Sequence, residues 1–413
     1  MPYSALEAKE IATLCTVVDC EHKTAPYVEK SDYLVVRTSN VRNGQLLMED
    51  MKYTTVDGYN EWTQRAVPAY GDVLFTREAP AGESCLVPHD KKVCMGQRMV
   101  MLRPNKDVTD PIFLSLILNT ERTKTDISRL SIGSTVSRIN IADIKKLKVA
   151  SPPLQEQRKI AQILSTWDRG IATTEKLIDA SKQQKKALMQ QLLTGKKRLI
   201  DPETGKVFEG EWETEQFDKL FDIEIGGTPS RSNETYWDDK LETNNNWLSI
   251  ADLKGKFISR TKERISDLGV AKSNVSLIPK GTIVMSFKLT IGRRAFLNID
   301  TYTNEAICAL LIKNKDKLDN NYLYQALEIV DFEQEIDQAV KGKTLNKAKL
   351  KRLKLLMPSV KEQQKIASVL TAADKDIELL EAKLLHFKQE KKALMQQLLT
   401  GKRRVKVAET EAA

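Results

Sequence analysis

The chain is poor in the residues that build redox, metal and nucleophilic sites. Its 413 residues include only three histidines and five cysteines, and aromatic side chains make up 6%. An odd number of cysteines spread over so long a chain is typical of a reducing compartment and argues against disulfides. Cys15 and Cys20 with His22 lack a usual zinc-site spacing, and no second cluster of ligands follows. We therefore expect no metal site.

Long apolar runs and targeting signals are also missing. No segment approaches the ~18 consecutive apolar residues that a membrane span requires. The segment from Met1 to Glu10 has neither the basic lead nor the apolar core of a signal peptide. We expect a cytoplasmic protein with no membrane partner.

Motifs for catalysis are absent as well. Gly342-Lys343-Thr344 looks like the end of a phosphate-binding loop, but Asp337 stands where that loop requires its first glycine. The Asn/Asp-Pro-Pro-aromatic tetrapeptide with which an amino-methyltransferase holds a flipped base does not occur. No Ser or Cys has a recognisable activating frame. We predict that the chain by itself is not an enzyme and has no catalytic residues.

What the chain does have is an internal repeat. The segment KKALMQQLLTGK at 185–196 occurs again at 391–402, an offset of 206 residues. Extending this register from 154–199 to 360–405 gives 24 identities in 46 positions. The same offset pairs Leu14 with Leu220 near the start of each copy. The chain is therefore nearly two copies of one unit.

The middle of each copy has diverged. Strand-like segments begin at Gly71 and Gly281, now at an offset of 210, and each is followed eleven residues later by a glycine, Gly82 or Gly292. Neighbouring side chains such as Arg77 and Lys288 no longer correspond. One scaffold that carries two different surfaces indicates a protein that recognises two different things.

A long helix is predicted at the end of each copy. Pro152-Pro153 and Pro358 precede stretches with almost no glycine that end in Thr-Gly-Lys. Positions spaced alternately by four and three residues form a heptad seam in both stretches. At ~1.5 Å per residue, each helix is a rod of roughly 60 Å, which overhangs a domain of this size. We predict that the two helices pair with each other, and the alternative is that each packs only on its own domain. The apolar seam positions are Ile160, Leu164, Trp167, Ile171, Leu188, Leu192, Ile366, Leu370, Ile377, Leu384, Leu394 and Leu398.

The predicted fold class is α+β. Short β-rich runs between Gly, Pro and Asn turns indicate a mixed α/β domain before each helix. A short connector joins the copies, and the intervening domain leaves room for the chain to return so that the helices form an antiparallel coiled coil. The expected boundaries are 1–150 for the first recognition domain, 151–199 for the central helix, 200–213 for the connector, 214–356 for the second domain, 357–405 for the C-terminal helix and 406–413 for a tail.

The charge balance points to a polyanionic partner. Lys and Arg outnumber Asp and Glu by 65 to 56, which gives a net charge of +9. Polar and basic side chains in the diverged middles are the candidates for contacts with phosphates and base edges, because they lie in turns or at strand ends. In the first domain they are His22, Lys23, Arg37, Thr38, Asn40, Arg77, Lys91 and Lys92, and in the second Thr228, Ser230, Arg231, Lys254, Lys256, Lys288, Arg293 and Arg294.

Taken together, these features resemble the specificity subunit of type I restriction-modification systems. The resemblance rests on the tandem order, on E-Q-x-K-I-A and L-L-T-G-K at the ends of both helices, and on Gly226-Gly-Thr-Pro-Ser and Leu277-Ile-Pro-Lys-Gly-Thr in the second domain. In the first domain, the segments that begin at Asp19 and Val36 have a similar pattern.

The resemblance implies a function for each part. Each variable domain would recognise one half of a gapped double-stranded DNA site, and the helices, as an antiparallel coiled coil, would set the gap. The chain would bind two modification subunits, which bind S-adenosylmethionine and methylate adenine, and through them restriction subunits that use ATP and Mg²⁺. No cofactor is expected on this chain itself.

Two other functions stay open on the sequence. One is a free-standing DNA-binding regulator whose two halves read an operator, which co-purification with or without methyltransferase subunits would distinguish. The other is a coiled-coil assembly factor with no nucleic-acid role, which a salt-dependent DNA mobility shift would eliminate.

Overall fold

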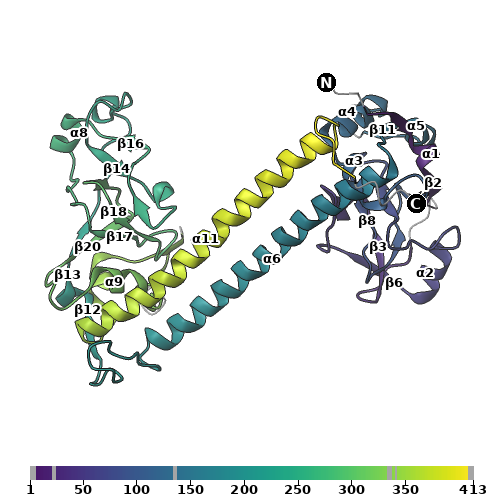
Figure 1. The fold of residues 1–413 in the computed structure, drawn as a ribbon. Coiled ribbons are helices and arrows are strands. Elements are labelled where there is room, and N and C mark those ends of the chain that lie inside the picture. The colour runs from purple at the N-terminus through teal and green to yellow at the C-terminus, as the bar shows by residue number, and fades with distance from the viewer. Residues whose placement is uncertain (1–5, 21–24, 134–136, 333–336, 340–341, 408–413) are drawn as a thin grey trace. The chain divides into compact units, whose positions relative to one another are not determined.

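The computed structural model describes residues 6–20, 25–133, 137–332, 337–339 and 342–407. Contacts divide the chain into two compact units, the first formed by 1–176 with 382–413 and the second by 177–381. Each unit therefore contains one globular domain, the N-terminal part of one long helix and the C-terminal part of the other (Figure 1).

The first globular domain is built on a four-stranded antiparallel sheet of order β2-β10-β7-β8. A second sheet, β6-β3-β9, contains a parallel pair in which Tyr33 lies opposite Lys92. The elements are β1 Ala8–Glu10, α1 Ile11–Leu14, β2 Cys15–Asp19, β3 Tyr33–Val36, η1 Thr38–Asn40, β4 Val41–Arg42, β5 Gln45–Leu46, β6 Lys52–Thr54, α2 Val56–Trp62, β7 Val73–Thr76, β8 Ser84–Leu86, β9 Lys92–Met95, β10 Met99–Pro104, α3 Pro111–Leu118, α4 Glu121–Leu130, α5 Ile141–Lys146 and β11 Lys148–Ala150.

The second globular domain repeats this plan. Its main sheet has the order β13-β20-β17-β18-β15, and the sheet β16-β14-β19 again contains one parallel pair. The elements are β12 Glu213–Gln216, α7 Phe217–Leu220, β13 Phe221–Ile225, η2 Glu234–Tyr236, β14 Asn246–Leu248, η3 Ile250–Asp252, β15 Phe257–Ile258, β16 Glu263–Arg264, α8 Asp267–Lys272, β17 Ile283–Ser286, β18 Arg294–Leu297, β19 Tyr302–Thr303, β20 Ile307–Ile312, α9 Asn320–Ala326, β21 Asp337–Ala339, β22 Gly342–Thr344, α10 Lys347–Arg352 and β23 Lys354–Met357.

The two long helices are α6, Leu154–Leu192, and α11, Val360–Leu398, each 39 residues long. They lie inside the segments 151–199 and 357–405 in which the sequence predicts helix. Gly195 and Gly401 follow their last turns with φ of 72° and 73°, a left-handed conformation that glycine adopts without strain. Local sequence therefore determines where both helices end.

One buried glutamine fastens the start of each long helix to the domain that precedes it. The side-chain oxygen of Gln157 accepts hydrogen bonds from the Asp110 N–H and the Thr109 hydroxyl, both at 3.0 Å, and its amide donates to the Pro152 carbonyl. Gln363 makes the equivalent bonds to the Asp319 N–H, at 2.8 Å, and to the Pro358 carbonyl. Both glutamines are 0% exposed, so these bonds fix each helix at the start of α3 or α9.

The C-terminal end of the other long helix completes each hydrophobic core. In the first unit, Leu398 and Leu399 pack in one cluster with Ile160 and Leu164. In the second unit, Leu192 packs in one cluster with Ile366 and Leu370 among its members. The alternative that each helix packs only on its own domain is therefore wrong, because α6 and α11 share a core in both units.

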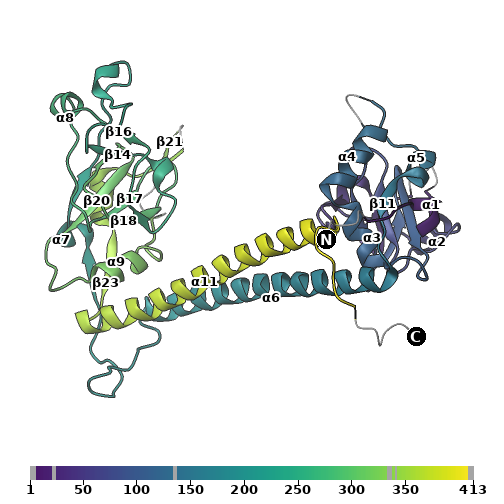
Figure 2. The ribbon, with the colours of Figure 1, turned by 45° about the horizontal axis from the view of Figure 1, so that its top comes forward.

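Within each unit, the helical segments run side by side and antiparallel (Figures 1 and 2). In the first unit Lys391 pairs with Asp168 and Lys388 with Glu175, and the rings of Trp167 and Phe387 meet edge to face at 5.5 Å. In the second unit Lys185 pairs with Asp374 at 2.5 Å and Lys182 with Glu381 at 2.6 Å. As the residue number rises along α6, the number of its contact residue on α11 falls, which confirms the predicted antiparallel pairing.

The twelve apolar seam positions face the partner helix or a domain core. Ile160, Leu164, Leu192, Ile366, Leu370, Ile377 and Leu398 are buried, and Trp167, Ile171, Leu188, Leu384 and Leu394 are half-buried. Leu177, Leu379 and Leu385, which lie off the seam, are 49% to 69% exposed. A heptad spacing therefore separates the packed face from the exposed one.

The five cysteines are reduced and buried. Burial raises the pKa of Cys15, Cys85, Cys94 and Cys308 to about 12. The pKa of Cys20 is also raised, mainly by burial. Because the thiolate is the reactive form, and because these thiols are covered, we expect none of them to react with a thiol reagent at pH 8 in the folded protein. Denaturant should expose all five, and rapid labelling of the native chain would contradict this packing.

Candidate nucleic-acid interface

The turn between two central strands makes the same two backbone hydrogen bonds in both domains. In the β7–β8 turn, Gly82 N–H donates to the Thr76 carbonyl at 2.9 Å and Thr76 N–H to the Glu83 carbonyl at 2.8 Å. In the β17–β18 turn, Gly292 and Ser286 make the same two bonds at the same distances. Ala79 and Leu289 share a positive φ, 53° and 63°. These shared bonds align the two turns at an offset of 210.

The side chains on this shared backbone have opposite charge. Glu78 and Glu83 in the first domain correspond to Lys288 and Arg293 in the second. Glu78 pairs with Arg98 and Arg138, both at 3.2 Å, whereas Lys288 and Arg293 have no carboxylate partner among the described residues. The equivalent turns thus differ in charge. In the first domain the turn carries acidic side chains that pair with basic ones, and in the second it carries basic side chains without a carboxylate partner among the described residues.

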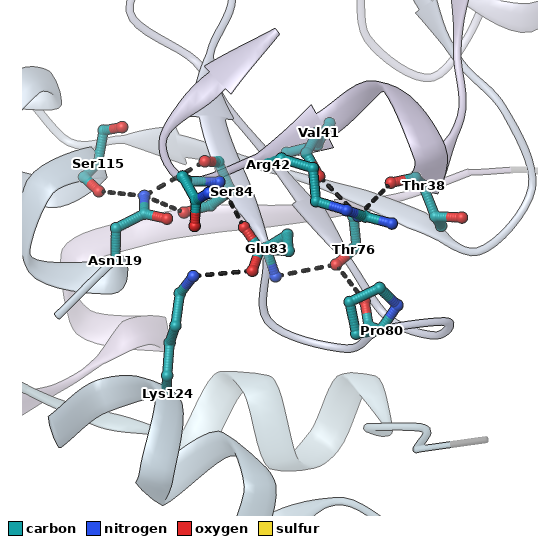
Figure 3. Close-up of polar contacts among 11 residues, drawn as sticks. Thr38, Val41, Arg42, Thr76, Pro80, Glu83, Ser84, Ser115, Asn119 and Lys124 are labelled. Atoms are coloured by element: carbon teal, nitrogen blue, oxygen red, sulfur yellow. Dashed lines mark hydrogen bonds and ion pairs between the residues drawn. The ribbon is translucent and has the colours of Figure 1, made fainter. Parts of the chain in front are cut away.

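In the first domain, Glu83 and its neighbours form a closed polar network (Figure 3). The Lys124 ammonium lies 2.7 Å from Glu83 Oε1, and Thr76 Oγ1 donates to the Pro80 carbonyl at 2.7 Å. Asn119 Nδ2 donates to Ser84 Oγ at 2.9 Å and to the Ser115 carbonyl at 2.8 Å. These bonds tie the turn to α3 and α4, and Asn119 Oδ1 is the one atom of the group that is buried without a hydrogen-bond partner among the described residues.

In the second domain, the corresponding residues line an open crevice of about 750 Å³. The segment after η3 provides Lys254 and Lys256, and the end of the β17–β18 turn with the first residue of β18 provides Arg293 and Arg294. These four residues belong to the predicted DNA contacts, and the fold brings them together from two segments about forty residues apart in sequence.

The crevice has exposed basic side chains at its mouth and, at its floor, more buried basic side chains that pair with carboxylates. Arg294 Nε donates to the Tyr324 carbonyl at 2.5 Å, and its guanidinium pairs with Glu328 at 2.7 Å. The Lys256 ammonium lies 3.9 Å from Asp374, which also pairs with Lys185. Lys254 and Arg293 have no ion partner in the part of the chain that the structure describes, so they are available to bind an anion.

A second group of predicted contacts lies in the loop that begins with Gly226. A Cβ at Gly226 would lie 2.1 Å from the Thr303 carbonyl oxygen, and one at Gly227 would lie 2.6 Å from Asn274 Oδ1, so only glycine fits at these two positions. The loop then presents Thr228, Ser230 and Arg231, of which Thr228 donates to Glu305. Close backbone packing thus places three candidates on one loop.

Arg231 is the most firmly oriented of these candidates. Its guanidinium pairs with both oxygens of Glu263, at 2.5 and 3.1 Å, and lies 3.6 Å from the centre of the Trp237 ring. The Arg231 side chain lowers the pKa of Glu263, mainly through these hydrogen bonds. The Arg231 side chain is still 52% exposed, so an oriented guanidinium faces solvent.

The first-domain candidates are not brought together. Arg37 and Thr38 follow the C-terminal end of β3, whereas Lys91 and Lys92 lie at the other end of the parallel β3–β9 pair. Lys92 lies over the Tyr33 ring at 5.1 Å. His22 and Lys23 lie outside the described residues.

Two predicted contacts, Asn40 and Arg77, are interior residues. Asn40 is 0% exposed, and its side chain bonds the backbone of Arg37, Leu47 and Glu49. Arg77 is 5% exposed and pairs with Asp19 at 3.2 Å. Neither can reach a DNA groove without unfolding its surroundings, so we correct the prediction and exclude both from the interface.

Sequence reasoning missed an ion pair that occurs once in each unit. Glu362 accepts two bonds from Arg198, at 2.6 and 2.7 Å, and one from Trp212 Nε1 at 3.1 Å. Glu156 accepts two from Arg404, at 2.7 and 2.5 Å. The offset of 206 relates the two pairs, and identical charges at matching repeat positions were the signal that could have revealed them.

Removing Glu362 should destabilise its unit more than removing Glu156 destabilises the other. The Glu362 carboxylate is 1% exposed and Arg198 only 22%, whereas Arg404 is 43% exposed. Breaking a buried pair costs about 3 kcal/mol, and a partly exposed one costs about 1 kcal/mol. Chemical denaturation of E362A and E156A should show this order, with E362Q intermediate. Equal losses would contradict it.

No metal cluster or membrane helix is found among the residues that the structure describes. No three His, Cys, Asp or Glu side chains gather there in a way that could hold a metal ion. No helix in the same residues is long and apolar enough to cross a membrane.

A family model described as "Type I restriction modification DNA specificity domain" matches residues 6–182 and 209–387. The chain belongs to this family. The two matches cover both copies of the repeat, so the type I specificity domain occurs twice, as the resemblance implies. Each match contains one globular domain and part of the long helix that follows it.

Relatives of the type I specificity family match along the whole chain. The putative type I restriction enzyme MjaX specificity subunit of Methanocaldococcus jannaschii is 25% identical over 418 residues, which cover 97% of this chain and 94% of the relative. A solved chain from a study of complex assembly and conformational transition in the type I R-M system has a TM-score of 0.61 at 17% identity, covering 97% of this chain and 100% of that one. The S subunit from M. genitalium has a TM-score of 0.57 at 13% identity, with 99% and 98% covered. These structural likenesses confirm the predicted fold.

Proposed function

We propose that the chain recognises a gapped DNA site, with one half-site read by each globular domain. The observation that carries this proposal is the pair of turns with the same backbone hydrogen bonds and opposite side-chain charges, because a shared scaffold with unlike surfaces is what reading two different sequences requires. Membership of the type I specificity family supports it. The helix pair then sets the distance between the two half-sites.

The proposed DNA contacts are the predicted residues that the fold leaves exposed or partly exposed. Phosphate contacts position a protein on DNA, and side chains that reach base edges specify the sequence. Arg231 is the best candidate for a base contact, because Glu263 and Trp237 hold its guanidinium and an oriented arginine recognises guanine well. The other candidates are Arg37, Thr38, Lys91, Lys92, Thr228, Ser230, Lys254, Lys256, Lys288, Arg293 and Arg294, with His22 and Lys23 outside the described residues.

The chemistry belongs to partner subunits in this proposal. Two modification subunits bind S-adenosylmethionine and methylate adenine, and restriction subunits that use ATP and Mg²⁺ join through them. The sequence of this chain contributes none of the motifs for these reactions, as its analysis indicates. Its role is to bring the partners to one DNA sequence.

Methyl transfer measured with labelled S-adenosylmethionine tests this division of labour. The purified chain alone and the modification subunits alone should each leave DNA unmethylated at the target. Mixing them should produce methylated adenine at one sequence. Methyl transfer by the rigorously purified chain, or methylation by the mixture without sequence preference, would overturn the proposal.

A further inference from the structure

The basic crevice of the second domain has a counterpart in the first that is built differently. The counterpart, about 590 Å³ in volume, is lined by Asn43, Gly44 and Asn119, and by Asp168 and Lys391 on the helices. Asp168 and Lys391 correspond to Asp374 and Lys185 at the offset of 206, whereas Ala172 takes the place of Glu378 on the helical side. Further differences lie in the residues that the globular domains contribute.

Hydrogen bonds establish which positions correspond. Arg37 N–H bonds the Asn40 side chain just as Ser249 N–H bonds that of Asp252, which aligns η1 with η3 at an offset of 212. Lys256 therefore corresponds to Gly44. In the β-turn alignment, Arg293 corresponds to Glu83 and Arg294 to Ser84.

Lys256, Arg293 and Arg294 thus correspond to Gly44, Glu83 and Ser84, which are three differences in charge at equivalent places. The second crevice has five cations, Lys185, Lys254, Lys256, Arg293 and Arg294, against three carboxylates, Glu328, Asp374 and Glu378. The first has three cations, Lys124, Arg169 and Lys391, against two carboxylates, Asp168 and Glu175. Glu83, in place of Arg293, pairs with Lys124 at 2.7 Å (Figure 3). Arg42, which corresponds to Lys254, turns its guanidinium back to the carbonyls of Thr38 and Val41, both at 2.8 Å.

Two of the five cations in the second crevice are unused. Lys254 and Arg293 are exposed, and neither has a carboxylate partner among the described residues. They come from two segments that lie side by side, because β15 pairs in parallel with β18 and the Phe296 N–H donates to the Lys256 carbonyl at 2.8 Å. Two such cations in one crevice suit an oxyanion with several acceptor oxygens, and the DNA backbone supplies such a group at every nucleotide.

We propose that Lys254 and Arg293 bind a phosphate of the DNA backbone beside the half-site that the second domain reads, and that the first domain has no such clamp. This inference rests on the proposed function. At the floor of the crevice, Lys256 pairs with Asp374 and Arg294 with Glu328. These pairs position the two segments that carry Lys254 and Arg293. The two half-sites are then held unequally, and the second contributes more of the salt-dependent affinity.

The double variant K254A/R293A tests the clamp. The full chain in complex with its modification subunits is bound to a duplex that carries the target, and affinity is measured over a range of salt concentrations. Loss of the one phosphate that both cations neutralise should reduce the slope of log K against log salt by about 0.9. Affinity at low salt should fall at least tenfold. The methylated sequence should stay the same, because no base contact is removed.

The control removes the same charge from the same domain outside the crevice. K240A/K272A replaces two exposed lysines with no ion partner among the described residues. It should leave the salt slope within error of the wild type. An unchanged slope in K254A/R293A, or an equal fall in the control, would overturn the clamp. A changed methylated base in K254A/R293A would also overturn it, because the crevice would then read sequence.

Neutral backbone analogues locate the phosphate. A scan of single methylphosphonate substitutions should weaken wild-type binding at one or two consecutive positions beside one half-site and leave K254A/R293A unaffected there. Inorganic phosphate tests the alternative that the crevice binds a free anion. If it raises the melting temperature of the wild-type chain but not of the variant, and no methylphosphonate position distinguishes the two proteins, the crevice binds a free anion and the DNA clamp is refuted. If the wild-type complex binds the scanned duplex without sequence preference, the proposed function itself fails.

Discussion

Exchanging residues 11–150 for the matching domain of another type I specificity protein should change one half of the methylated DNA sequence and leave the other half unaltered. The expected effect is a complete switch of that half-site, because every proposed contact of the first domain lies in the exchanged segment. Sequencing of methylated adenines in cells that express the hybrid measures both halves at once.

The structure provides the junctions for this exchange. Strand β1 pairs with β11 through backbone hydrogen bonds, which any sequence can make. Gln157 holds the backbone N–H of Asp110 at the start of α3, so the incoming domain must keep an N-cap there. The reciprocal control exchanges 214–356 and should change only the other half. A hybrid that changes both halves would show that the domains do not read independently.

Lengthening both long helices together should widen the gap between the half-sites without changing their bases. Seven residues inserted in the middle of each helix keep the heptad seam in register and add about 10 Å at 1.5 Å per residue. That length corresponds to about three base pairs at the ~3.4 Å rise of duplex DNA. Methylation mapping of the lengthened chain should therefore find the original half-sites about three base pairs further apart.

A matched control lengthens α6 alone. Leu192 and Leu193 at its end are 1% and 0% exposed in the core of the second unit, so a one-sided insertion pulls buried side chains out of register. We expect this variant to lose most of its activity. An unchanged gap in the two-helix variant, with full activity, would mean that the helices do not set the spacing.

The repeat made much of the fold predictable. Two segments of identical sequence at a fixed offset must adopt the same structure, so one helix prediction supports the other. Buried prolines at the start and glycines at the end mark the boundaries of both helices. The seam predicted their pairing, because a rod longer than its domain has to bury its apolar face elsewhere. The roles of Gln157 and Gln363 are seen only in the structure, because they depend on which backbone groups lie beside these side chains.

The candidate site was less predictable, because burial is a tertiary property. Asn40 and Arg77 have the right chemistry for DNA, but folding buries both side chains. Lys254 and Arg293 were chosen one by one, and only the parallel pairing of β15 with β18 brings their segments into one crevice. The offset between equivalent residues is 206 in the helices but 210 or 212 in the middle of the domains. Equivalent positions there could therefore not be found by applying one offset along the chain.

The methylated sequence of the wild-type complex tests the central claim most directly. Single-molecule sequencing of DNA modified by this chain with its modification subunits should show one motif with two halves separated by a fixed gap. The halves should differ in sequence, because the equivalent turns of the two domains present Glu78 and Glu83 in one case and Lys288 and Arg293 in the other. A continuous motif, or one whose halves are identical, would contradict the account.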